Sequence, residues 1–427
     1  MPSLTESPTL QHITRPECST WIASEAYIMS IAALPSRYAI APSAPSTSID
    51  ILDQTNLRIV QSLPGHTGGV TTLRTVSAIG GSNAPALVSS GRDGSVKMWD
   101  ERSNAHSIKM TDLGKARAIL CVDVSPDGLT VAGGTDLQGD DATILYWDPR
   151  QPAAPLRAHS STHSDDITTL HFSPFDPSGK TLLSASSDGL LSVSNAAEDD
   201  EDEAVLHVAN WGCSVSQADW VGARGTSPTI TTNASGTDTP HAIWAASDME
   251  TFSTWSPELD PYTSFDIKAP AVQRIDRPWV TDYLIAGHST GDASHPLALF
   301  VGSNEGDIAL ISPSSSASEP TTSWTLHKKW LHGHAGVVRS LLWDESNGVL
   351  VTGGEDSKLN VWSLNGTTMD DEGNGMNNGG NDMDDDGNEM DMDAPQMPYQ
   401  SPGSSQGRKR SMSWDGEDEL EGKRVRR

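Results

Sequence analysis

The chain has 427 residues, with 57 Asp and Glu against 28 Lys and Arg, and a formal net charge of −29. This acidity argues against broad binding of a nucleic-acid backbone, and no apolar run approaches the ~20 residues that a membrane span needs. Three widely spaced cysteines, Cys18, Cys121 and Cys213, predict neither a disulfide framework nor a zinc site.

The earliest clear element along the chain is LVSSGRDGSVKMWDER, at residues 87–102. Strand-forming residues alternate around Asp93-Gly94, a dipeptide that favours the tight turn of a β-hairpin. The pattern recurs at residues 182–195 and 350–363, and each copy has an Asp six residues before Trp99, Ser194 or Trp362. The sequence therefore predicts three related hairpins.

Weaker copies occupy the intervals between these hairpins and the stretch before the first. One landmark at the end of each copy gives seven positions: 52, 99, 147, 194, 255, 311 and 362. Their separations lie between 47 and 61 residues, and this near-constant period indicates a repeat architecture. A single sheet of this kind cannot bury both of its faces, so we expect seven sheets to stack around an axis and close into a ring.

Three copies also carry an upstream histidine, at His66, His163 and His334. With Gly-His near its start and Trp-Asp at its end, the repeat resembles the WD-repeat β-propeller family. Residues 208–222, 243–256 and 332–344 are similar to the group of WD repeat-containing protein 89. The resemblance implies an all-β, seven-bladed WD-repeat β-propeller over residues 1–365, for which we expect no cofactor and no metal.

The last copy ends after its third strand, at Leu364, so its outer strand must come from another part of the chain. We expect Leu10–Ile22 to supply this strand, because closure of the ring leaves no unpaired edge. The third copy lacks the histidine, and the first, fifth and sixth lack both the histidine and the Trp-Asp pair.

The resemblance also implies buried hydrogen-bonded groups inside the blades. The Ser–His–Asp combination that they contain is typical of hydrolases, but a nucleophile is not expected in several copies. We interpret these groups as structural, because each polar atom satisfies another, and we predict that the chain is not an enzyme. The groups are His66, Ser89, Asp93 and Trp99; His334, Thr352, Asp356 and Trp362; and His163, Ser184 and Asp188, with Ser194 in place of the tryptophan.

After residue 365 the composition changes. Residues 366–407 are acidic and contain few branched apolar side chains, which predicts disorder. The segment Asp382–Gly387 imitates a calcium loop, but Glu389 stands where an apolar residue belongs, so no metal is expected. Residues 408–427 resemble a bipartite nuclear-import signal read by an importin, which implies the nucleus as well as the cytoplasm; the alternative is a generic basic end. The basic residues are Arg408, Lys409, Arg410, Lys423, Arg424, Arg426 and Arg427.

The function that this organisation favours is a non-enzymatic scaffold for protein–protein interactions, as a monomeric ring that binds neither nucleic acid directly nor a membrane. Arg92, Ser187 and Glu355 stand just before the turn Asp and are candidate partner contacts; the alternative is ordinary solvated surface.

Two further hypotheses concern the kind of partner. Trp99-Asp100-Glu101-Arg102 and Trp147-Asp148-Pro149-Arg150 resemble the box by which propellers bind the adaptor of cullin-RING ubiquitin ligases. Arg102 and Arg150 would then contact the adaptor from the face of the ring opposite to that of Arg92, Ser187 and Glu355. Alternatively, the chain escorts a basic nuclear or ribosomal protein, because residues 366–427 hold 15 acids and 7 bases and the rest holds 42 acids and 21 bases. Plain solubility explains this acidity equally well.

Overall fold

The computed structural model describes residues 3–22, 25–100, 102, 104–112, 117–222, 241–269, 271–272, 279–290, 296–313, 323–345 and 347–364. The acidic segment 366–407 and the basic clusters of residues 408–427 lie outside these ranges. Within them, the structure contains one short helix, α1 (Glu201–Ala204), and otherwise β-strands. No helix in the described ranges is long and apolar enough to cross a membrane.

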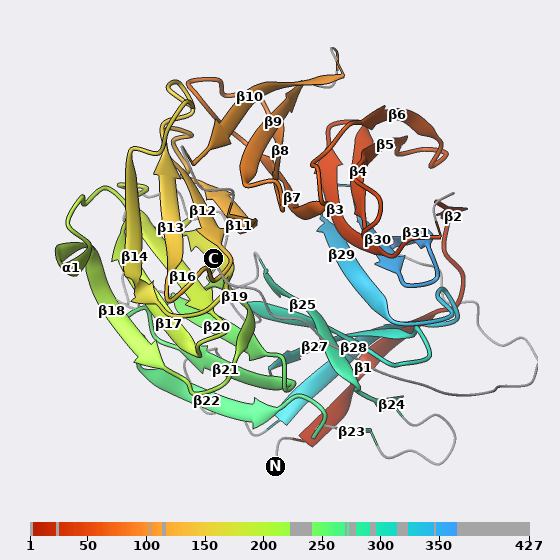
Figure 1. Cartoon of the computed structure of the whole chain (residues 1–427). Coiled ribbons are helices and arrows are strands. Elements are labelled where there is room, and N and C mark those ends of the chain that lie inside the picture. The colour runs from red at the N-terminus through yellow and green to blue at the C-terminus, as the bar shows by residue number, and fades with distance from the viewer. Residues whose placement is uncertain are drawn as a thin grey trace, which may run out of the picture. The chain divides into compact units, whose positions relative to one another are not determined.

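The strands form seven blades, which we number in chain order (Figure 1). Blade 1 consists of β3 (Ile28–Leu34), β4 (Arg37–Pro42), β5 (Ile49–Asp53) and β6 (Ile59–Leu63). Blade 2 consists of β7 (Val70–Val76), β8 (Ala86–Gly91), β9 (Ser95–Asp100) and β10 (Ala105–Thr111). Blade 3 consists of β11 (Ile119–Val124), β12 (Val131–Thr135), β13 (Ala142–Trp147) and β14 (Arg157–His163).

The remaining blades follow the same order. Blade 4 consists of β15 (Ile167–Phe172), β16 (Thr181–Ser186), β17 (Leu190–Asn195) and β18 (Val205–Asn210). Blade 5 consists of β19 (Val215–Val221), β20 (Ala242–Ser247), β21 (Thr251–Trp255) and β22 (Pro261–Asp266). Blade 6 consists of β25 (Tyr283–Ser289), β26 (Leu297–Gly302), β27 (Ile308–Pro313) and β28 (Ser323–Trp330), with the fifth strand β1 (Ser3–Ile13). Blade 7 consists of β29 (Val338–Asp344), β30 (Val349–Gly354), β31 (Lys358–Ser363) and β2 (Cys18–Trp21). A small hairpin, β23 (Ala271–Val272) and β24 (Trp279–Val280), precedes blade 6.

The innermost strands establish the ring. Each of them contacts the innermost strand of the next blade, and the last contacts the first; they are β3, β7, β11, β15, β19, β25 and β29. The blades therefore follow one another around a common centre (Figure 1). The seven-bladed β-propeller that the repeat predicted is confirmed, and all seven sequence landmarks lie on or at the end of a third strand.

Burial explains why these strands have their particular composition. The second strands, such as β8 and β20, are buried at every position, because both faces of each sheet are covered by neighbouring blades. Their short continuous apolar runs are typical of such strands. The outermost strands, such as β18, are intermediate or exposed along their length, because no further strand covers them. The hydrophobic core thus lies between the blades.

The amino-terminal residues close the ring in two steps. Strand β2 pairs antiparallel with β31, so that Cys18 lies opposite Val361 and Trp21 opposite Lys358. This confirms closure by an amino-terminal strand, but the closing strand is shorter than the expected range Leu10–Ile22. The residues up to Ile13 pair instead with blade 6, where β1 runs parallel to β28. The segment between the two strands carries the chain from blade 6 to blade 7.

Side-chain hydrogen bonds join neighbouring blades at a recurrent position of the innermost strand, just after its β-bulge. This residue donates to a backbone carbonyl of the next blade at six of the seven seams: Ser30, Thr72, Cys121, Thr169, Gln217 and Ser340. The equivalent residue of blade 6 is Ala286, whose methyl side chain has no hydrogen-bond donor. At that seam the Tyr283 hydroxyl accepts a hydrogen bond from the Val338 N–H, at 2.8 Å. Blades 6 and 7 are therefore held together differently from the others.

Candidate functional site

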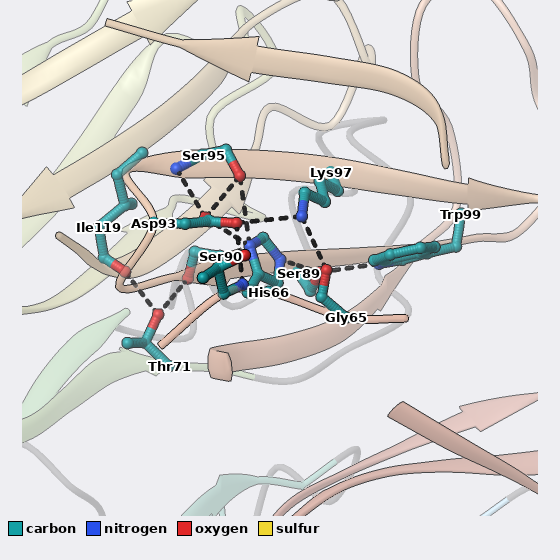
Figure 2. A network of polar contacts seen from close by, with 11 residues as sticks. Gly65, His66, Thr71, Ser89, Ser90, Asp93, Ser95, Lys97, Trp99 and Ile119 are labelled. Atoms are coloured by element: carbon teal, nitrogen blue, oxygen red, sulfur yellow. Dashed lines mark hydrogen bonds and ion pairs between the residues drawn. The ribbon is translucent and has the colours of Figure 1, made fainter. Parts of the chain in front are cut away.

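A buried polar network lies in blade 2, at the end of the sheet where β8 turns into β9 (Figure 2). We call this end of the blades the upper face. The Asp93 carboxylate accepts from His66 Nδ1 at 2.8 Å. The Ser89 hydroxyl lies 2.6 Å from His66 Nε2 and accepts from Trp99 Nε1 at 2.8 Å. The four residues that the sequence singled out in this blade are thus brought together in one chain of hydrogen bonds.

Two residues that the sequence analysis missed complete the blade 2 network. Ser95 donates from its hydroxyl to Asp93 at 2.6 Å, and Lys97 donates to the other carboxylate oxygen at 3.1 Å and to the Gly65 carbonyl at 2.7 Å. Burial opposes ionisation of Asp93, but the hydrogen bonds from His66 and Ser95 prevail and hold the pKa of this carboxyl well below its usual range. Burial also lowers the pKa of His66, so the ring stays neutral and donates through Nδ1.

Blade 7 repeats the arrangement with a threonine in place of the serine. His334 Nδ1 lies 3.0 Å from Asp356, and Thr352 Oγ1 lies 2.8 Å from His334 Nε2 and accepts from Trp362 Nε1 at 3.0 Å. Asn360, which is fully buried, donates to the Gly333 carbonyl at 2.9 Å. Asn360 takes the place that Lys97 has in blade 2.

Blade 4 holds the incomplete version of the group. His163 Nε2 lies 2.8 Å from Ser184 Oγ, but His163 Nδ1 is 3.4 Å from Asp188 and makes no hydrogen bond to it. Asp188 instead accepts the backbone N–H groups of Ser164 and Leu190, both at 2.8 Å. Ser194 stands where the other two blades have tryptophan, and it makes no hydrogen bond to Ser184. The group is therefore looser in this blade.

These groups organise the blades and present no reactive atom to solvent. The Ser89 hydroxyl belongs to a fully buried residue, and both of its neighbours are already hydrogen-bonded to it. Ser184 and Thr352 are likewise fully buried. A nucleophile needs access to a substrate, so the Ser–His–Asp geometry here is a structural one. Within the described ranges, no three His, Cys, Asp or Glu side chains are placed to hold a metal ion.

The candidate contact residues Arg92, Ser187 and Glu355 occupy equivalent positions on the upper face. The backbone N–H of each donates to a carbonyl of the loop that enters its blade: Gly69, Asp166 and Val337, at 3.1, 2.9 and 2.9 Å. Arg92 is exposed, whereas Glu355 is half-buried and pairs with Arg339 at 2.5 Å. These positions therefore differ in what they offer to a partner.

Asp136 and Asp248 make the same backbone contact in blades 3 and 5, to the carbonyls of Ala118 and Ser214. Sequence reasoning missed them because the strong Asp-Gly turn is absent from these blades. Together with Glu355 they give the upper face three acids at one structural position.

Arg102 and Arg150 lie at the opposite end of the blades, which we call the lower face, because each follows the end of its third strand. In both motifs the arginine N–H donates to the aspartate two residues earlier, Asp100 or Asp148, at 3.0 and 2.9 Å. The side chains differ. The Arg150 side chain donates hydrogen bonds to the Asp148 carboxylate from Nε and Nη2, at 2.9 and 2.7 Å. Within the described part of the chain, the exposed Arg102 guanidinium makes no hydrogen bond or ion pair.

A cleft of about 550 Å³ opens beside Arg102 on the lower face, between blades 1 and 2. Its walls come from the β3–β4 turn, the β7–β8 loop and the end of β9 with the residues that follow. The lining residues are Pro35, Ser36, Arg37, Ser82, Ala84, Pro85, Ala86, Leu87, Met98, Trp99, Asp100, Arg102 and Ser107. Sequence reasoning found Arg102 but missed Arg37, because Arg37 belongs to a different blade.

Comparison with known proteins agrees with this architecture. The family model "WD domain, G-beta repeat" matches residues 57–100, 108–148, 153–193 and 324–363. The chain is similar to the WD repeat-containing protein 89 homolog of Dictyostelium discoideum, with 24% identity over 344 residues, 79% of this chain and 83% of the relative. It is also 24% identical over 289 residues to an uncharacterized WD repeat-containing protein of Schizosaccharomyces pombe, covering 65% of this chain and 79% of that protein. An uncharacterized WD repeat-containing protein of Saccharomyces cerevisiae is 28% identical over 242 residues, which cover 56% of this chain and 54% of that protein.

Proposed function

We propose that this chain, which forms a seven-bladed β-propeller and matches the WD-repeat model in four segments, is a non-enzymatic scaffold that holds other proteins against the two faces of its ring. Propellers of this family generally act by binding other proteins. The observation that carries the proposal is the location of the polar residues. The Ser–His–Asp groups are hydrogen-bonded to one another inside the blades, whereas the exposed charges lie on the loops at both faces.

Proximity labelling in cells with the full-length chain tests the scaffold. We expect a reproducible set of neighbouring proteins that is smaller when upper-face residues such as Arg92 and Asp248 are substituted by alanine. These residues are exposed, so the variants are expected to fold. Turnover of a small molecule by the purified protein, or the absence of any reproducible neighbour, would contradict the proposal.

We place the scaffold in the nucleus as well as the cytoplasm. The support is the pair of basic clusters, Arg408–Arg410 and Lys423–Arg427, whose spacing suits two acidic grooves of an importin. A fluorescent fusion of the full chain is expected to lose nuclear signal when either cluster is changed to alanine. Unchanged distribution after both changes contradicts this location.

A second candidate function is that of a substrate receptor of a cullin-RING ubiquitin ligase. The observation that favours it is the Arg102 guanidinium on the lower face, in one of the two Trp-Asp-x-Arg motifs, which makes no hydrogen bond or ion pair to another described residue. Affinity purification of the wild type and of the double variant Arg102→Ala/Arg150→Ala is expected to recover less adaptor with the variant. Equal recovery removes this candidate.

The third candidate is an escort for a basic nuclear or ribosomal protein. It is supported by the excess of acids in the ring and by the recurrent acids Asp136, Asp248 and Glu355 on the upper face. Binding of a basic client through these charges is expected to weaken as salt is added. A client that stays bound at high salt and without residues 366–407 would argue against an escort.

A further inference from the structure

The lower-face cleft combines positive charge with apolar walls in an otherwise acidic ring. Two arginines, Arg37 and Arg102, line it, while residues 1–365 carry 42 acids against 21 bases. Among the described residues of the lining, the one acid is Asp100, which accepts the backbone N–H of Arg102. The cleft is therefore a local exception to the charge of the surrounding molecule.

The contrast between the two Trp-Asp-x-Arg motifs shows which arginine is available. Both motifs form the same backbone turn, so their main chains do not distinguish them. The Arg150 guanidinium is engaged in two parallel hydrogen bonds with Asp148, which raises the pKa of Arg150 and lowers that of Asp148. The Arg102 guanidinium has no such partner among the described residues and borders the cleft. A carboxylate from outside the chain can thus take the place beside Arg102 that Asp148 takes beside Arg150.

The walls of the cleft indicate what must accompany that carboxylate. Pro35, Ala84 and Pro85 are exposed, and the half-buried Met98 lines the same cleft and packs against the apolar core. These side chains offer apolar surface that a free inorganic anion cannot use. An apolar side chain next to an acidic one can use it.

The geometry points to a docking site for an acidic segment of a partner protein, in which an Asp or Glu pairs with Arg102 and a neighbouring apolar side chain contacts Pro35, Pro85 and Met98. This inference rests on the proposed scaffold function and names the chemistry of one class of partner. The arginine supplies orientation, because its planar donors match a carboxylate, and the apolar walls select the residue beside it. The occupied Arg150 provides a matched control.

The test is selection from a random peptide display library on the immobilised full-length chain, as wild type and as the Arg102→Ala and Arg150→Ala variants. We expect the wild type and Arg150→Ala to enrich peptides with Asp or Glu next to an apolar residue, and Arg102→Ala to lose this enrichment. The enriched peptide is then synthesised with a fluorophore and measured by anisotropy. We expect Arg102→Ala to weaken its binding by about tenfold or more, and Arg150→Ala to change it by less than about twofold.

The proposal is overturned if no acidic peptides are enriched, or if Arg102→Ala and Arg150→Ala bind the synthetic peptide equally well. It is also overturned if replacing the Asp and Glu of the peptide by Asn and Gln leaves its affinity unchanged. Arg102 is exposed, so its variant should keep the unfolding midpoint of the wild type, which excludes misfolding as the cause. Cellular neighbours that persist in Arg102→Ala would leave the scaffold standing without this site, whereas the absence of all neighbours would reject the scaffold itself.

Discussion

At the scale of single residues, the contrast between Asp93 and Asp188 shows how the same turn residue can contribute different amounts of stability. Asp93 accepts hydrogen bonds from the side chains of His66, Ser95 and Lys97, whereas Asp188 relies on two backbone N–H groups and a distant His163. Removing the acceptor from a buried network leaves its hydrogen-bond donors unsatisfied. The free energy lost in this way exceeds the net free energy that the hydrogen bonds contribute to stability.

We therefore predict that Asp93→Ala lowers the free energy of unfolding by about 2 kcal/mol, and that Asp188→Ala lowers it less. Urea unfolding of the full chain measures both. The control is Arg92→Ala, the exposed neighbour in the same turn, which should stay within about 0.5 kcal/mol of the wild type. Equal losses at Asp93 and Asp188 would contradict the role that we assign to the side-chain network.

The pKa shifts in this network predict the direction of the pH dependence. Because the pKa of His66 is lower in the folded chain, the unfolded chain binds an extra proton as the pH falls below about 6.5, and stability is lost. The lowered pKa of Asp93 adds a second loss below about pH 4, where the unfolded carboxyl becomes protonated. The loss between about pH 7 and pH 5 should be smaller in His66→Asn than in the wild type, as measured by urea midpoints. Parallel curves for the two proteins would refute this.

At the scale of elements, one side-chain hydrogen bond recurs at an equivalent position of six seams between blades. Ser340 of blade 7 donates to the Ile28 carbonyl of blade 1 at 2.8 Å, and this bond accompanies the apolar cluster that joins the last blade to the first. The corresponding seam between blades 6 and 7 has Ala286 at that position and uses Tyr283 instead. Burial raises the pKa of Tyr283 to about 12, so its hydroxyl stays protonated at neutral pH.

We predict that Ser340→Ala lowers the free energy of unfolding by about 1 kcal/mol, because the Ile28 carbonyl loses its donor at a buried seam. Chemical unfolding provides the measurement, and Ser36→Ala, an exposed turn serine, provides the control. A Ser340→Ala variant as stable as the Ser36→Ala variant would show that this seam does not depend on the bond.

The two amino-terminal strands have different roles and should respond differently to deletion. Removing residues 1–13 leaves blade 6 with its four antiparallel strands, whereas removing residues 1–22 also exposes the edge of β31 and opens blade 7. We predict that the longer deletion lowers the melting temperature more and causes aggregation, since an unpaired strand edge can pair with another chain. Thermal unfolding and size-exclusion chromatography compare the two. A similar loss in both would mean that β2 does not close the ring.

At the scale of the whole molecule, the charge balance opposes compactness. With a net charge of −29, like charges repel one another in the folded chain. Salt weakens this repulsion, because the Debye screening length is only about 10 Å at 0.1 M ionic strength. We predict that the melting temperature rises between about 0.01 M and 0.15 M sodium chloride. Calorimetry in the two buffers measures the change. A fall in the melting temperature would indicate that attractive ion pairs, such as Arg74–Asp123 at 2.9 Å, outweigh the net repulsion.

Much of the ring was predictable from the sequence, since the repeat is local. The landmarks of successive third strands are separated by 47 to 61 residues, and in the clearest copies an Asp turn precedes the strand and a Trp lies near its end. Blades 5 and 6 lack the upstream histidine and the Trp-Asp pair, and they share an apolar cluster in which Trp244 stacks on Phe252 and Phe252 meets Trp324 edge-on. Aromatic side chains can fill a core in many orders, so this cluster has no periodic pattern in the sequence.

The sequence by itself determined the number of blades and the closure of the ring by an amino-terminal strand, because these follow from the repeat and from the need to cover every sheet. The resemblance to the WD-repeat family implied most residues of the buried polar groups, whereas Ser95, Lys97 and Asn360 were found only in the structure. The tertiary structure alone decided which of the two arginine side chains is hydrogen-bonded to the aspartate of its own motif. Arg102 and Arg150 stand in the same four-residue motif, and their difference arises from where each guanidinium points and from Arg37 and Pro35, which the preceding blade brings to the cleft. Contacts between residues so far apart along the chain exist only once the blades have stacked, and no local pattern encodes them.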